Sequence, residues 1–258
     1  MSTPAPFPAE RSVVVTGAAS PRGIGRATAD RLARDGWSVA LLDLDADAAA
    51  ATAAQIAAAH GAQVLGVGAD VADEASVHAA FDVLEAALPP VVGVANLAGI
   101  SSPTAFLDET VDAWDRVFAV NMRGTFLVTQ RALRGMVDRG VGRVVSVSSV
   151  SAQRGGGTYS KVAYSASKAA ILGFTRALAR EVGEHGVTVN AVAPGPIDTD
   201  IMGGTLTDER KASMSADVLM GRVGTREEVA ALLAFLLSED AGWITAATYD
   251  INGGLHAS

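Results

Sequence analysis

Seven short apolar runs, each separated from the next by a longer helix-forming stretch, recur from residue 12 to the end of the chain. The runs are rich in valine, and most of them lack the polar/apolar alternation of a half-exposed strand. Strands of a parallel sheet have this composition, because crossover helices cover both of their faces. We therefore predict strands at 12–16, 38–42, 64–68, 91–96, 143–148, 187–192 and 248–251.

The intervening stretches predict helices near 24–35, 45–60, 73–87, 110–139, 164–183 and 226–238. The alanine tract at 46–59 is included because alanine is the best helix former, and Asp45 or Asp47 can cap its start. The expected fold class is α/β, with a doubly wound parallel seven-stranded sheet in a three-layer α/β/α sandwich. No linker interrupts the pattern, so we expect one domain over 11–258. The proline-rich start, 1–10, is expected to be disordered or extended.

Composition narrows the class of protein. The chain has 258 residues, 49% of them hydrophobic, which is enough for an extensive core. A net charge of −8 argues against nucleic acid as a partner. The chain has no cysteine, and its four histidines are too scattered to indicate a metal site. Neither a signal peptide nor a membrane span is predicted, so we expect a cytoplasmic protein that does not bind membranes.

A glycine-rich loop joins the first predicted strand to the first helix, with Gly17, Gly23 and Gly25 in it. Glycine lets a ligand approach the backbone closely, and the helix N-terminus offers free N–H groups to a pyrophosphate. No Gly-Lys-Ser/Thr follows, which excludes a P-loop. Asp43 ends the second strand, where a dinucleotide fold places a carboxylate on the adenosine ribose. Alternatively, Asp43 could cap the helix that follows.

Further motifs follow along the chain, namely Asn96-Leu97-Ala98-Gly99, Asn121, Ser148-Ser149, Tyr164-x-x-x-Lys168 and Pro194-Gly195. Together with the glycine loop and Asp43, they occur in the order and approximate spacing of the short-chain dehydrogenase/reductase family. The chain resembles that family over about residues 11–255. The resemblance implies a Rossmann-like fold, a nicotinamide dinucleotide cofactor and oxidoreductase activity on a small-molecule alcohol or ketone.

Tyr164 and Lys168 lie four residues apart and so share one face of a predicted helix. A nearby ammonium stabilises phenolate, so we expect Lys168 to lower the pKa of Tyr164. By resemblance, Tyr164 is the general acid/base, and Lys168 also binds the nicotinamide ribose. Ser149, rather than its neighbour Ser148, is expected to hold the reacting oxygen. Asn121 is expected to support a water relay for the proton.

The resemblance also implies a set of cofactor-binding residues along the carboxyl ends of the strands. In this set Asp70 borders the adenine ring, Pro194 and Gly195 lie beside the nicotinamide, and Ile197 and Thr199 reach its carboxamide. The full set is Gly17, Ser20, Arg22, Gly23, Ile24, Asp43, Asp70, Val71, Asn96, Ala98, Gly99, Tyr164, Lys168, Pro194, Gly195, Ile197 and Thr199.

The chain departs from the family pattern in the glycine loop. Five residues separate Gly17 from Gly23, two more than usual, and Pro21 suggests that the extra pair bulges outward. Arg22 could pair with the 2′-phosphate of NADP, whereas the Asp43 carboxylate would repel it. We predict NAD, with NADP not excluded. Leu97 replaces the second asparagine of the usual Asn-Asn-Ala-Gly.

The stretch 200–224 loses regular periodicity and carries Met202, Leu206, Met214, Leu219 and Met220. We interpret it as a substrate lid whose apolar side chains either contact a partly hydrophobic substrate or pack the lid onto the body. Gln153, Arg154 and the glycines at 155–157, which indicate a loop, could also line the pocket. Tyr159 has no lysine four residues later and is not a candidate.

The expected reaction is interconversion of a secondary alcohol, such as a sugar, polyol or cyclic alcohol, with its ketone. An NADP-dependent 3-oxoacyl reductase would use the same catalytic residues. A dinucleotide-sensing binding protein is a non-enzyme alternative, disfavoured by the complete Ser, Tyr, Lys and Asn set. The resemblance also implies a homotetramer built from the helices near 110–139 and 164–183.

Overall fold

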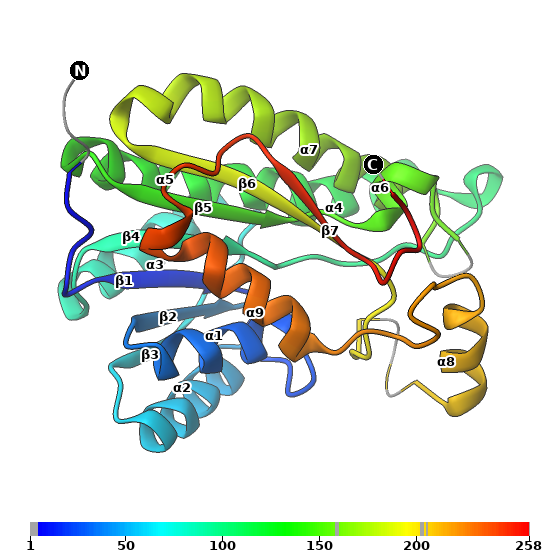
Figure 1. Ribbon diagram of the computed structural model, residues 1–258, viewed down its shortest axis with the longest axis horizontal. Coiled ribbons are helices and arrows are strands. Elements are labelled where there is room, and N and C mark those ends of the chain that lie inside the picture. Colours follow the sequence, from blue (N-terminus) through cyan, green and yellow to red (C-terminus); the bar gives the residue numbers. More distant parts are fainter. Residues whose placement is uncertain (1–4, 158–159, 202–203, 205, 258) are drawn as a thin grey trace.

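The computed structural model describes residues 5–157, 160–201, 204 and 206–257. Its centre is one seven-stranded sheet in the order β3-β2-β1-β4-β5-β6-β7. All six strand pairs are parallel. The strands are β1 (Ser12–Thr16), β2 (Ser38–Asp43), β3 (Val64–Gly68), β4 (Val91–Asn96), β5 (Gly142–Val147), β6 (Val187–Pro194) and β7 (Thr248–Ile251). The predicted doubly wound α/β fold and its seven strands are confirmed (Figure 1).

Helices cover both faces of the sheet (Figure 1). One face packs against α1, α2 and α9, and the other packs against α3, α5 and α7. The helices are α1 (Ile24–Arg34), α2 (Ala46–His60), α3 (Glu74–Ala87), α4 (Val111–Phe118), α5 (Gly124–Arg139), α6 (Val150–Arg154), α7 (Val162–Val182), α8 (Asp208–Ser215) and α9 (Arg226–Leu237). The molecule therefore has the predicted three layers in one domain.

Each face of the sheet has its own apolar core, because successive residues of a strand point to opposite faces. Val13 and Val15 of β1 pack toward α1 and α9, whereas Val14 packs toward α3 and α5. All three valines are fully buried. This two-sided burial explains why the strands read as continuous apolar runs in the sequence.

The helix predicted at 110–139 is interrupted. A π-helical turn at Ala119–Arg123 separates α4 from α5, and it contains the candidate residue Asn121. A π-turn inserts one residue into a helix and leaves the chain helical on both sides, so the sequence still reads as one helical stretch. The helical stretch predicted near 110–139 is confirmed, but the sequence did not indicate the π-turn within it.

Two short helices were not predicted. Ser149 starts α6, and its side chain accepts a hydrogen bond from the Ser151 N–H. Thr207 starts α8 and caps it in the same manner, through the Arg210 N–H. Helix α8 is mostly polar, so it lacks the apolar repeat by which a helix is recognised, and it lies within the stretch 200–224 where the sequence loses regular periodicity.

Residues 5–10 form no helix or strand, as expected, but they pack against the rest of the domain. The Phe7 ring packs edge-on against Trp37, with 5.7 Å between ring centres. The Arg11 guanidinium lies over both rings. Aromatic and cation–π contacts of this kind stabilise an otherwise irregular segment.

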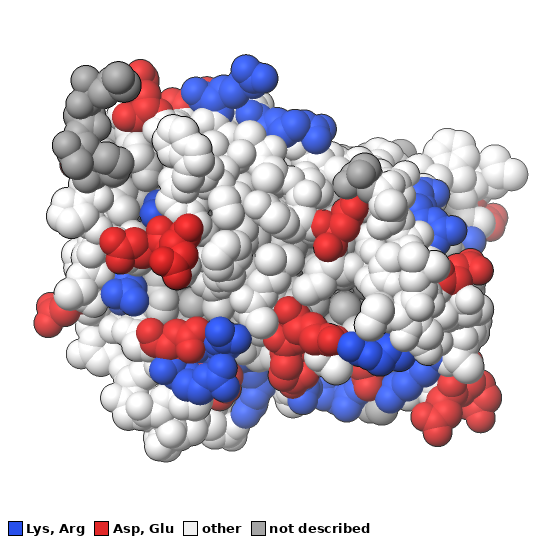
Figure 2. All heavy atoms as spheres, in the orientation of Figure 1, with Lys and Arg blue, Asp and Glu red and all other residues white. Residues whose placement is uncertain are grey.

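The surface carries basic and acidic side chains interspersed with each other, as Figure 2 shows for one face. Among the described residues, no helix is long and apolar enough to cross a membrane. Within the same residues, no cluster of histidine and carboxylate side chains could hold a metal ion.

Candidate active site

A cavity of 850 Å³ lies at the carboxyl ends of the strands. It opens beside β1 and β4, where the chain reverses its direction of progress across the sheet, and ligands of such folds bind at this point. The side chain of Thr16 joins the two strand ends there. Its hydroxyl accepts hydrogen bonds from the backbone N–H groups of Leu97, at 3.0 Å, and Ala98, at 2.9 Å.

The glycine loop forms one wall of this cavity. Gly17 has a φ of 66°, and a Cβ there would lie 2.9 Å from the Ala98 Cα, so a side chain would not fit without a shift. Helix α1 begins at Gly23 without a side-chain cap, which leaves its first N–H groups available to a ligand. These features fit the pyrophosphate of a dinucleotide.

The two extra loop residues form a tight turn. The Gly23 N–H donates to the Ser20 carbonyl at 2.9 Å, and Pro21 occupies the second position, where its fixed φ suits a β-turn. Ser20 and Pro21 are exposed, in agreement with the predicted outward bulge. The Arg22 side chain does not line the cavity and instead forms ion pairs with Asp198 and Asp200.

Asp43 lies in the cavity wall at the end of β2. Its two carboxylate oxygens accept hydrogen bonds from the Ala19 N–H, at 2.9 Å, and the Asp45 N–H, at 3.4 Å. Each oxygen can accept a further bond, so a ribose hydroxyl can still be bound. The cap of α2 is Asp45, so the alternative role of Asp43 as that cap was wrong.

Asp70 and Val71 also line the cavity, on the loop that follows β3. One Asp70 oxygen accepts a hydrogen bond from the Ala72 N–H at 2.9 Å, which fixes the carboxylate within its own loop. Val71 is buried against Gly124, where a Cβ would lie 2.8 Å from a Val71 methyl group.

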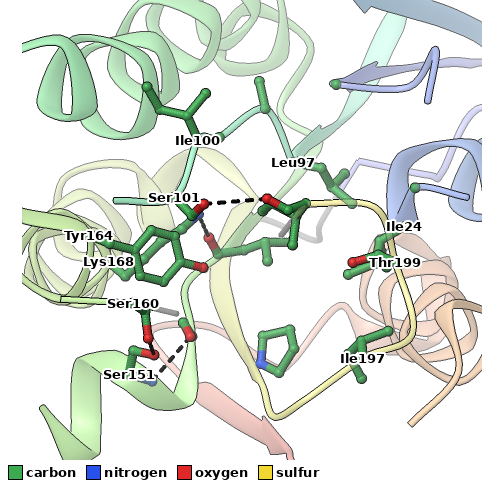
Figure 3. Close-up of a pocket in the computed structure, with 18 of the residues that line it drawn as sticks. Ile24, Leu97, Ile100, Ser101, Ser151, Ser160, Tyr164, Lys168, Ile197 and Thr199 are labelled. Atoms are coloured by element: carbon green, nitrogen blue, oxygen red, sulfur yellow. Dashed lines mark hydrogen bonds between the residues drawn. The ribbon is translucent and has the colours of Figure 1, made fainter. Parts of the chain in front are cut away.

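Tyr164, Ser149 and Lys168 meet in the same cavity. Helix α7 carries Tyr164 and Lys168 on one face, as predicted, and Ser149 precedes α6. In Figure 3, Tyr164 and Lys168 project into the cavity from one side and Ile197 and Thr199 lie on the opposite side. The Ser149 hydroxyl lies close enough to the Tyr164 side chain to lower its pKa. Ser148 also borders the cavity, but its hydroxyl donates to the Lys168 carbonyl at 2.7 Å.

The electrostatics of this group differ from the prediction. Burial raises the pKa of Tyr164 above its usual value, and the hydrogen bond with Ser149 lowers it only in part. Burial also lowers the pKa of Lys168 to about 8. The Lys168 ammonium donates to the Val147 carbonyl at 2.7 Å and lies 5.8 Å from the centre of the Tyr164 ring. In the chain alone, desolvation therefore outweighs the ammonium charge at Tyr164.

Asn121 and Asn96 are buried and do not line the cavity. The Asn121 amide forms two hydrogen bonds with the backbone of Ile100, of 2.8 and 3.0 Å, and a third with Ser167. The Asn96 amide donates to Thr129 and Ser146 inside the core. Both asparagines hold the loop or strand on which cavity residues are carried.

Most of the predicted site residues therefore share one cavity. Those that line it are Gly17, Ser20, Gly23, Ile24, Asp43, Asp70, Val71, Ala98, Gly99, Ser149, Tyr164, Lys168, Pro194, Gly195, Ile197 and Thr199. The predicted residues that do not line it are Arg22, Asn96 and Asn121. Among the other candidates, Arg154 and Met214 line it, whereas Met202 lies outside the described residues, as does the rejected Tyr159.

Sequence reasoning missed three serines beside the candidate catalytic group. Ser101, Ser151 and Ser160 line the cavity, and the hydroxyls of Ser151 and Ser160 lie 2.9 Å apart (Figure 3). They come from three different loops or helix starts. Isolated serines in loops give no periodic signal, and only the fold brings these three together.

Comparison with known proteins places this site in context. Residues 17–256 match the family model described as enoyl-(acyl carrier protein) reductase. An uncharacterised short-chain type dehydrogenase/reductase of Sinorhizobium fredii is 42% identical, over 95% of this chain and 97% of that protein. A 3-oxoacyl-[acyl-carrier-protein] reductase of Aquifex aeolicus is 40% identical, over 94% and 96%.

The fold has close counterparts among solved structures. A blue fluorescent protein from a metagenomic library, solved in complex with NADPH, superposes with a TM-score of 0.87. It is 35% identical in sequence, and the alignment covers 96% of this chain and 98% of that one. The similarity extends over nearly the whole length in each comparison, so the chain belongs to the short-chain dehydrogenase/reductase family and is an oxidoreductase of that family.

Proposed function

We propose that the protein is an NAD-dependent oxidoreductase that interconverts a secondary alcohol and its ketone by hydride transfer, with Tyr164 as general acid/base. One observation carries this proposal. Tyr164, Ser149 and Lys168 converge in a single cavity whose other wall is a glycine loop and a helix N-terminus suited to a dinucleotide. The bound nicotinamide supplies the hydride acceptor for oxidation, or the hydride donor for reduction.

The protein residues have separate roles in this proposal. Tyr164 accepts the hydroxyl proton of the alcohol in oxidation and returns it to the ketone oxygen in reduction. The Ser149 hydroxyl, which lies beside the Tyr164 side chain, holds the reacting oxygen there. Lys168 supplies positive charge next to the phenol and contacts the nicotinamide ribose. Three hydrogen bonds with Ile100 and Ser167 hold the Asn121 amide, so we assign it a positioning role in support of any proton relay.

The preference for NAD rests on Asp43 and on Arg22. The Asp43 carboxylate is held in the cavity wall by two backbone N–H groups, where it would repel a 2′-phosphate. The Arg22 guanidinium, which could have attracted that phosphate, is paired with two carboxylates. The similar blue fluorescent protein was solved with NADPH, so the two nucleotides must be compared directly. Higher kcat/KM with NADP would contradict this part of the proposal.

The cavity wall near Tyr164 favours a substrate with more than one polar group. Ser101, Ser151 and Ser160 supply hydroxyls that can donate or accept hydrogen bonds. Apolar contacts come from Ile100, Met214 and Leu255. This mixture suits a polyol, a sugar or a substituted cyclic alcohol. As in the sequence-based prediction, the segment 200–224 would act as the substrate lid.

Reduction of a 3-oxoacyl group with NADP is the second candidate function. The similarity to the Aquifex reductase favours it, since the same catalytic residues would serve. The two candidates are separated by assaying NADPH-dependent reduction of acetoacetyl-CoA beside NAD-dependent oxidation of polyols and cyclic alcohols. Nicotinamide absorbance reports both reactions. A protein that bound nucleotide but turned over no alcohol or ketone would instead be a sensor.

We further propose that the enzyme is a cytoplasmic homotetramer. Val111, Phe126 and Val162, on the helices expected at the interfaces, are exposed apolar side chains that a second copy could cover. Light scattering should give four times the chain mass. A monomeric mass would exclude this assembly.

A further inference from the structure

Arg22 links the glycine loop to the segment that follows β6. Its Nη2 lies 2.6 Å from Asp198 Oδ1, and its Nε lies 3.1 Å from Asp200 Oδ1. All three side chains are about one third exposed or less. Solvent screens such half-buried pairs only in part, so both contribute to holding the two segments together.

The second oxygen of Asp198 extends the link to α8. Lys211 Nζ lies 2.8 Å from Asp198 Oδ2, so one carboxylate is shared between the glycine loop and α8. The pKa of Asp198 is lowered, chiefly by its hydrogen bond with Lys211 and further by the charge of Arg22. Asp198 is therefore ionised throughout the neutral range and available to both cations.

The other end of the same segment is tied to the loop as well. Arg226, the first residue of α9, donates from Nη1 to the Pro21 carbonyl at 3.2 Å. The Asp198 N–H donates to the Gly224 carbonyl at 3.1 Å, and the Gly224 N–H donates to the Pro196 carbonyl at 2.9 Å. Pro21 and Arg22, in the lengthened glycine loop, thus contact both ends of the chain segment 196–226. Acidic and basic side chains adjoin on the surface between α9 and α8 (Figures 1 and 2).

We propose that Arg22 is a positioning residue that fixes the distance between the two walls of the cofactor cavity, and that it does not read the 2′-position of the nucleotide. One wall is the glycine loop, with Gly17 and Ile24, and the other carries Ile197 and Thr199. This inference rests on the proposed dinucleotide function of the cavity. It predicts that replacement of Arg22 weakens the binding of NAD and of NADP to the same extent.

The test compares Arg22→Gln with the wild-type protein by measuring the Kd of NADH and of NADPH through nucleotide fluorescence, without substrate. Both Kd values should rise by about 3- to 10-fold, the range for two half-exposed ion pairs, and their ratio should stay constant. Asp198→Asn should act in the same direction. Arg31→Gln is the matched control, because it removes a 2.7 Å pair with Asp35 on α1 away from the cavity.

If the Kd rose for NADPH alone, the proposal would be overturned and Arg22 would instead bind the 2′-phosphate. Unchanged Kd values for both nucleotides would overturn it as well. Limited proteolysis in the absence of nucleotide gives a second readout. Cleavage within 199–224 should be faster in Arg22→Gln than in the wild type or in Arg31→Gln, and equal rates would contradict the link. Neither readout depends on turnover, so failure to find an alcohol substrate would refute the proposed function and leave this result standing.

Discussion

The Lys168 ammonium lies 5.8 Å from the centre of the Tyr164 ring and is anchored by the Val147 carbonyl at 2.7 Å. One turn of α7 separates the two residues, so the helix sets their spacing, and the end of β5 sets the direction of the lysine. The ammonium is thereby held near the phenol without forming an ion pair with it. Ser149 completes the group, since its hydroxyl lies close enough to the Tyr164 side chain to lower its pKa in part.

Replacement Tyr164→Phe removes the hydroxyl and retains the ring. Turnover of any alcohol or ketone substrate should fall by about 100-fold or more, the usual contribution of a general acid/base. Nucleotide fluorescence should show that binding of NADH changes little. Tyr249→Phe, on β7, is the control and should retain activity. An unchanged rate in Tyr164→Phe would disprove the acid/base role.

The pKa of Tyr164 can be tested directly by absorbance of phenolate. Because burial raises this pKa above the usual value near 10, less than about 10% of Tyr164 should be ionised at pH 9 in the protein without nucleotide. The signal is the difference in phenolate absorbance between the wild type and Tyr164→Phe as the pH is raised. Addition of NAD should move ionisation to lower pH, since oxidised nicotinamide brings positive charge. Ionisation near pH 7 without NAD would contradict the prediction.

Lys168 makes the free energy of unfolding depend on pH. Its pKa is about 8 in the folded chain and 10.5 when unperturbed, so the unfolded state binds more protons between these values. The cost of burying the charge is fully present below pH 8 and is relieved as pH rises toward 10.5. Stability should therefore rise by about 2 kcal/mol from pH 8 to pH 10 on account of this group.

Urea unfolding of the wild type and of Lys168→Met measures this effect. The difference between their free energies of unfolding should shift in favour of the wild type by that amount over the same interval. Ionisation of Tyr164 occurs in both proteins, so its contribution largely cancels in the difference. A pH-independent difference would show that Lys168 keeps its ordinary pKa.

The architecture could be predicted from the sequence because each strand is buried on both faces, and burial leaves a continuous apolar run. The failures occurred where a local feature leaves no such pattern. The π-turn around Asn121 leaves the chain helical on both sides, and α8 is mostly polar. The anchoring of Phe7 on Trp37 depends on residues thirty positions apart, which no local pattern reports.

Much of the cavity lining could be predicted in outline, since the glycines and Asp43 follow strand ends that meet at one edge of the sheet. Side-chain direction could not be predicted. Arg22 turns to Asp198 and Asp200, and Asn96 turns into the core, although both lie beside cavity residues in the sequence. The direction of the pKa shift at Tyr164 also depends on burial, which the spacing of two residues does not reveal.

Replacement Asp43→Asn tests the basis of the proposed cofactor preference. Asparagine has nearly the same shape but no charge, so repulsion of a 2′-phosphate should be relieved while one acceptor for the ribose remains. We expect kcat/KM to fall with NAD and to rise with NADP, each by about 10-fold, equivalent to about 1.4 kcal/mol. Asp47→Asn, on the exposed start of α2, is the control. If the ratio of the two values does not change, Asp43 does not select the nucleotide.

Thr16 provides a test of the junction between β1 and β4. Its hydroxyl is the acceptor for the Leu97 and Ala98 N–H groups, and the residue is 2% exposed. Thr16→Val keeps the shape and removes the acceptor, so two buried donors lose their partner. The free energy of unfolding should fall by about 2 to 4 kcal/mol in urea denaturation, since each unsatisfied buried donor costs about 1 to 3 kcal/mol. Thr16→Ser keeps the hydroxyl and should lose less than half as much. Equal losses in the two variants would mean that the methyl group, and not the hydrogen bonds, stabilises this junction.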